Sequence, residues 1–118
     1  ESDLYCIDLT TGETTCMDAL NSDDVESYHS WSSNSRWLVF STRRDDGLYT
    51  KPYFSYIDAD GNAHKPFLLP QRNPRHYYDS KMFAYNIPEF VSAKVTLTGS
   101  EIASFARKGK ARKLTFRK

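Results

Sequence analysis

The chain has 118 residues, of which 39% are hydrophobic and 14% aromatic, and it carries a formal net charge of +1. The aromatic content argues against a disordered chain, and no run of about 18 apolar residues is present to form a transmembrane helix. Residues 1–26 hold eight acidic and no basic side chains, whereas residues 102–118 hold seven basic and no acidic ones. In one reading, these two segments form solvated surfaces that are complementary to each other. In the other, the C-terminal segment is a basic arm for an acidic partner, such as nucleic acid or anionic lipid.

The first segment predicts a β-hairpin. Residues 4–9 alternate and are rich in β-forming side chains, residues 10–13 have the composition of a turn, and residues 14–17 form the returning strand. A three-residue loop at 10–12 would place Cys6 directly opposite Cys16. The acidic stretch that follows reads as a connection to the next unit.

Residues 27–69 predict a four-stranded antiparallel sheet. We expect strands at 27–32, 36–42, 49–58 and 63–69, separated by turns at 33–35, 45–47 and 60–61. Large side chains occur in both alternating sets of the second strand, which indicates burial on both faces of the sheet. Trp31 and Trp37 are therefore expected to be buried.

These segments resemble a known repeat. Residues 31–42 read Trp-Ser-Ser-Asn-Ser-Arg-Trp-Leu-Val-Phe-Ser-Thr, which resembles the Trp-Ser-Pro-Asp-Gly-Lys-Trp-Ile-Ala-Phe-Ser-Ser start of a TolB-like β-propeller blade. Residues 4–12 are similar to the family's outer strands, Leu-Tyr-x-x-Asp-Leu-x-Thr-Gly. The family's Pro-Asp-Gly turn is replaced at 33–35, where Asn34 tolerates a left-handed conformation. Since such a blade takes about 40 residues and the chain begins at Glu1, we expect a fragment of fewer than two blades.

The resemblance implies an all-β fold of antiparallel propeller-blade sheets, as a partial propeller, and the residues beyond it add one short C-terminal helix. Residues 1–70 would form the blades, with an outer half-blade at 3–18 and a full blade at 27–69. Residues 71–118 would form a non-repeat segment with that helix and a basic tail.

The non-repeat segment begins with a loop at 71–75 and holds short β-like stretches at 82–85, 93–97 and 114–116. Thr98 and Glu101 match a capping box, and Gly109 is placed to end a helix. The sequence therefore predicts a helix over 99–108.

Few residues suggest chemistry. Cys6 and Cys16 either form a disulfide or remain free thiols, and the periplasmic location of the TolB-like family favours the bond. The three histidines are scattered, and no nucleophile elbow or phosphate-binding glycine loop is present. We expect no catalytic residues, no metal site, no cofactor and no enzymatic activity.

Polar, aromatic-rich loops are the candidate partner contacts, because propeller loops form binding surfaces. The candidates are Arg43, Arg44, Arg72, Arg75, His76, Tyr77 and Tyr78. The resemblance implies a non-catalytic binding or scaffold segment of a bacterial cell-envelope propeller, periplasmic or outer-membrane-associated, that binds a protein. The alternative is the propeller portion of a larger glycan- or peptide-binding or processing protein whose catalytic part lies outside this chain.

Exposed blade edges and faces lead to a further expectation. Either the chain self-associates through them, or residues 77–118 fold back over the open face. The basic tail is not expected to read nucleic acid specifically, because no recognised binding motif surrounds it.

Overall fold

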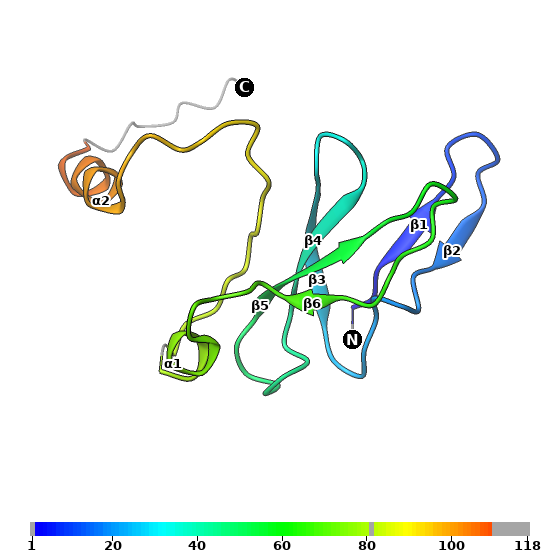
Figure 1. Ribbon diagram of the computed structural model, residues 1–118, viewed down its shortest axis with the longest axis horizontal. Coiled ribbons are helices and arrows are strands. Elements are labelled where there is room, and N and C mark those ends of the chain that lie inside the picture. The colour runs from blue at the N-terminus through cyan, green and yellow to red at the C-terminus, as the bar shows by residue number, and fades with distance from the viewer. Residues whose placement is uncertain (1, 81, 110–118) are drawn as a thin grey trace, which may run out of the picture.

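The computed structural model describes residues 2–80 and 82–109 (Figure 1). Within them lie the strands β1 (Tyr5–Ile7), β2 (Thr14–Cys16), β3 (Glu26–Trp31), β4 (Trp37–Thr42), β5 (Lys51–Tyr56) and β6 (Phe67–Leu68), and the helices α1 (Pro74–Asp79) and α2 (Gly99–Lys108). The strands form a two-stranded sheet, β1-β2, and a four-stranded sheet in the order β3-β4-β5-β6. The chain is mostly β, as the sequence predicts, and the described strands do not close into a ring. In that same part of the chain, neither helix is long and apolar enough to cross a bilayer.

Each strand of the larger sheet pairs with the next strand along the chain, in the order that the sequence predicts. Between β4 and β5, Phe40 lies opposite Tyr53 on one face, and Trp37 lies opposite Tyr56 on the other. Successive side chains of a strand point to opposite faces. Leu38, Val39 and Phe40 are nevertheless all buried, which confirms that β4 is covered on both faces.

The turn between β3 and β4 forms without the Pro-Asp-Gly sequence. The Ser32 backbone amide donates to the Trp37 carbonyl oxygen at 2.9 Å, and the Asn34 side chain accepts from the amide of Arg36 at 3.1 Å. The left-handed residue is Ser35, with φ of 55°, and not Asn34. Asn34 stabilises the turn through its side-chain oxygen instead.

The hydrophobic core lies between the β1–β2 hairpin and one face of the larger sheet. Leu4, Met17 and Leu20 come from the hairpin and its connection to β3. Their partners from the larger sheet and the turn after β5 are Leu38, Phe40, Tyr53 and Ile57. Asn21 holds the hairpin in place, because its side chain accepts from the amide of Leu4 at 2.8 Å and donates to the carbonyl of Leu4 at 3.1 Å.

The predicted register of the first hairpin is wrong by one residue. Cys16 lies opposite Tyr5, Cys6 lies opposite Thr15, and both cysteines are free thiols. The Asp8 carboxylate accepts from the amides of Thr10 and Thr11, and the Asp8 amide donates to the Glu13 carbonyl. The loop therefore takes four residues, 9–12, and not three. The two cysteines belong to different cross-strand pairs, so the structure does not contain the disulfide that was considered from the sequence.

The two tryptophans are less buried than expected. Trp31 is 42% exposed, and together with Tyr5 and Ile7 of the hairpin it lines a cavity of about 200 Å³. Trp37 is half-buried. Its ring packs edge-on against Tyr56 at 5.4 Å and Phe67 at 6.2 Å.

The segment after β6 differs most from the prediction. Residues 74–79, expected partly as loop, form α1, because Asn73 caps the helix and Pro74 begins it. The β-like stretches at 82–85 and 93–97 are not strands, since neither is paired in a sheet. The helix at 99–108 is confirmed with its capping box. The stretch at 114–116 lies outside the described residues.

Residues 85–90 fold back onto the second face of the larger sheet, which meets part of the expectation for residues 77–118. The Tyr85 amide donates to the Thr50 carbonyl at 2.9 Å, and the Ser41 hydroxyl donates to the Tyr85 carbonyl at 2.6 Å. The Phe90 ring lies 5.7 Å from that of Phe54. Beyond this point the chain leaves the sheet, and α2 stands clear of it on the side away from the β1–β2 hairpin (Figure 1).

Candidate functional site

The exposed members of the predicted partner-binding set gather at α1. Arg72 precedes the helix cap Asn73, Arg75 and His76 lie in the helix, and all three of these charged or titratable side chains are exposed. Asn73 accepts from the amide of His76 at 3.2 Å, which fixes the start of the helix. The fold therefore presents two arginines and a histidine at or just before one short helix, α1.

Arg44 is held within the fold and not presented to solvent. Its guanidinium lies 3.0 Å from the Glu26 carboxylate and 4.9 Å from the centre of the Tyr53 ring. It also donates to the Leu20 carbonyl. Arg44 lies in the predicted loop after β4, but it serves as the counter-charge of a buried carboxylate and not as an exposed partner contact.

Arg43 and Tyr78 also make internal contacts. Arg43 pairs with Asp24 at 3.0 Å while 39% of its side chain remains exposed. Tyr78 is buried and donates its hydroxyl to the Leu69 carbonyl at 2.8 Å. Burial raises the pKa of this phenol. The half-buried Tyr77 ring lies 5.1 Å from Tyr78, so the tyrosine pair anchors α1 beneath its exposed side chains.

A charged depression of about 330 Å³ separates α1 from the loop between β4 and β5. Lys51 in its floor lies 3.3 Å from Asp45 and 3.0 Å from Asp46. The amides of Tyr49 and Leu48 donate to Asp46 and lower the pKa of this carboxyl to about 2. Since Lys51 is paired with Asp45 and Asp46, this part of the depression resembles a structural ion cluster more than a reaction centre.

The described residues offer little that could hold a metal. Nowhere in 2–80 or 82–109 do three His, Cys, Asp or Glu side chains come together in a suitable group. The aspartates of the turn after β5 are used locally, because the Asp58 carboxylate accepts from the amides of Asp60 and Asn62.

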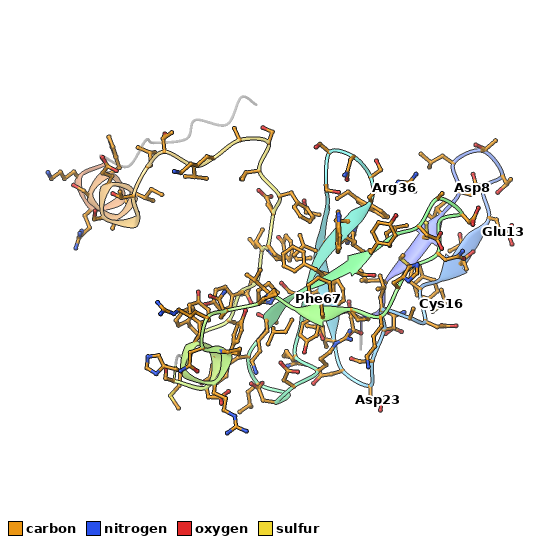
Figure 2. All side chains as sticks on the ribbon, viewed as in Figure 1. Asp8, Glu13, Cys16, Asp23, Arg36 and Phe67 are labelled. Carbon is orange, nitrogen blue, oxygen red and sulfur yellow. The ribbon has the colours of Figure 1, made fainter. Side chains whose placement is uncertain are left out.

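Sequence reasoning missed an exposed group of aromatic rings on the second face of the larger sheet. We call it the aromatic face, and its members are Trp37, Phe54, Tyr56, Phe67 and Phe90. The rings of Phe54 and Phe67 stack with their centres 6.1 Å apart. Phe54 also contacts Phe90, and Phe67 also contacts Trp37. Figure 2 labels Phe67, a member of this face, on β6, and it labels Arg36, the residue just before Trp37 and β4. The alternation of Phe54 and Tyr56 along β5 was a signal that could have located this face.

The aromatic face is only partly covered. Tyr56 is 38% exposed and Phe67 is 43% exposed, although both lie next to the half-buried Trp37. Phe90 covers the end of the face near Phe54. The part around Trp37, Tyr56 and Phe67 remains an apolar surface of the kind that binds another protein element.

Comparison of the sequence with protein-family models and with curated proteins, and of the fold with solved structures, finds no match for this chain.

Proposed function

We propose that the chain is a non-catalytic binding segment of a TolB-like β-propeller of the bacterial cell envelope, and that it binds a protein partner through α1. The proposal rests on the resemblance at residues 4–12 and 31–42 together with the arrangement of the strands.

The observation that carries the proposal is the packing of the β1–β2 hairpin on one face of the four-stranded sheet. A propeller is built from four-stranded antiparallel sheets stacked face to face around an axis. The strand order β3-β4-β5-β6 is that of one such sheet. The hairpin precedes it in the chain and contributes Leu4 and Met17 to their shared core, as the outer half of a preceding blade would.

The partner surface is assigned to α1 because its basic side chains are exposed while its tyrosines pack inward. Arg72, Arg75 and His76 are exposed, whereas the tyrosines beneath them are packed into the fold. Arginine is enriched at protein interfaces because its guanidinium makes several hydrogen bonds and packs on flat surfaces. An acidic protein surface is the complementary chemistry.

Site-specific photo-crosslinking in bacterial cells tests this proposal. A photoreactive side chain is placed at Arg75 in one variant and at Ser33, an exposed turn residue, in the control. We expect a discrete protein adduct from position 75 that is absent from position 33, in the envelope fraction. Equal adducts at both positions, none at either, or adducts only in the cytoplasmic fraction would contradict it.

A further inference from the structure

Two apolar surfaces have no partner among the residues that the structure describes. The first is the open part of the aromatic face, around Trp37, Tyr56 and Phe67. The second is α2, in which no residue is buried, Ile102 is 50% exposed and Phe105 is 73% exposed. Helix α2 makes no contact with any strand of the described structure.

Helix α2 has the form of an amphipathic helix that binds a surface. Ile102, Phe105 and Ala106 follow at the spacing of one helical face, while Arg107 and Lys108 lie outside that stripe. The capping box of Thr98 and Glu101 defines where the helix begins. An isolated helix of this length is marginal in water, so its apolar face gains most from a surface to pack against.

We propose that the aromatic face is a docking surface for an amphipathic helix, and that its occupant is α2 of the same chain. This inference does not depend on the proposed partner at α1, and in a full propeller α2 would hold the place that a following blade takes. It concerns the sheet face opposite the β1–β2 hairpin, and it leaves the exposed side chains of α1 free.

The length of the linker allows this docking. Residues 91–98 connect Phe90, already in the aromatic face, to α2, and eight extended residues span about 26 Å. The rings form a chain of contacts across the face. The ring centres lie 5.7 Å apart for Phe90 and Phe54, 6.1 Å for Phe54 and Phe67, and 6.2 Å for Phe67 and Trp37. A short linker also gives the helix a high effective concentration at the face.

Two acidic side chains lie in the turn next to the aromatic face, and two basic side chains lie at the end of α2. The turn after β5 carries Asp58 and Asp60, and His64 connects this turn to the aromatic face. The imidazole of His64 lies 3.5 Å from the Asp58 carboxylate, and its ring lies 5.5 Å from that of Tyr56. Arg107 and Lys108 lie in the last turn of α2. Asp58 and Asp60 of this turn suit the basic C-terminal end of α2, although Arg36 also reaches the turn and donates to the Asp58 carbonyl at 2.7 Å.

Fluorescence of Trp37 tests the docking. Trp31, on the other face of the sheet, is changed to phenylalanine so that Trp37 is the only tryptophan. In this background, Ile102→Ser/Phe105→Ser removes the apolar stripe of α2, and Ala103→Ser is the matched control outside the stripe. We expect the double variant to raise acrylamide quenching of Trp37 by about twofold with a red-shifted emission, because the docked population is lost. The control should match the background protein.

A second measurement is made from the sheet side. Phe67→Ser removes one of the exposed rings, and hydrogen exchange of the α2 amides should become faster than in the background protein. Unchanged Trp37 quenching in the helix double variant, or an equal effect of Ala103→Ser, would overturn the proposal. So would a difference that disappears on dilution, because α2 would then come from a second copy.

Discussion

The Nη2 atom of Arg44 lies 3.0 Å from Oε1 of Glu26, a carboxylate with no exposed surface. The hydroxyls of Thr42 and Ser22 donate to the same carboxylate at 2.9 and 2.6 Å. This cluster joins the connection after β2 to the ends of β3 and β4. It therefore fixes how the first hairpin meets the four-stranded sheet.

Arg44→Ala should lower the free energy of unfolding by about 3–5 kcal/mol, because it leaves the buried Glu26 charge without its partner. The matched control is Arg43→Ala, which breaks the partly exposed pair with Asp24 and should cost about 0–1 kcal/mol. Urea unfolding of both variants measures the difference. Equal costs would show that the buried Arg44–Glu26 pair contributes no more to stability than the partly exposed one.

The stability of the protein should fall in acid through Asp46. Backbone amides of Tyr49 and Leu48 lower the pKa of this carboxyl from 3.8 to about 2 in the folded state. A lowered folded pKa contributes stability that is fully present above the unfolded pKa and is lost as the pH falls through the folded value. Unfolding free energies measured between about pH 5 and pH 2 should therefore decrease. Asp46→Asn should flatten this decrease, and parallel curves for the two proteins would contradict the assignment.

Local patterns in the sequence predicted the larger sheet and α2, because alternation, turn residues and a capping box act over a few neighbouring residues. Strands predicted at 27–32 and 36–42 are found at Glu26–Trp31 and Trp37–Thr42. The helix predicted at 99–108 is found at Gly99–Lys108. The register of the first hairpin could not be predicted in the same way, because it depends on which amides the Asp8 carboxylate binds.

The candidate site was less predictable, because exposure depends on contacts between distant segments. Arg43 and Arg44 are neighbours in the sequence, yet only Arg44 is enclosed, since Glu26 lies beneath it. Tyr77 and Tyr78 likewise differ in burial according to which side of α1 faces the sheet. The aromatic face combines residues of β4, β5 and β6 with Phe90, and no window of the sequence contains them all.

The two tryptophans should contribute unequally to stability. Trp37→Ala should cost about 2 kcal/mol, less than a fully buried tryptophan, because the ring is half-buried among Tyr56 and Phe67. Trp31→Ala is the comparison and should cost less than Trp37→Ala, because Trp31 is 42% exposed and borders a cavity. Urea unfolding measures both. A larger cost for Trp31 would show that the first hairpin closes onto it in solution.

The hydroxyl of Ser41 should hold residues 85–90 against the sheet. Ser41 is fully buried and donates to the Tyr85 carbonyl at 2.6 Å. Ser41→Ala should cost about 1 kcal/mol, because the Tyr85 carbonyl loses its hydrogen-bond donor. The matched control is Ser55→Ala, since Ser55 is equally buried and donates to the His64 carbonyl at 2.6 Å within the β5–β6 region.

The two serine variants should lose similar global stability, so hydrogen exchange of individual amides is used to tell their local effects apart. The Tyr85 amide, which donates to the Thr50 carbonyl, should exchange faster in Ser41→Ala than in Ser55→Ala. The reason is that, of these two serines, only Ser41 bonds to the folded-back segment, so its loss favours local opening of that segment. Equal exchange of the Tyr85 amide in the two variants would show that the other contacts of residues 85–90, among them the Phe90–Phe54 ring contact, hold the segment without the Ser41 hydroxyl.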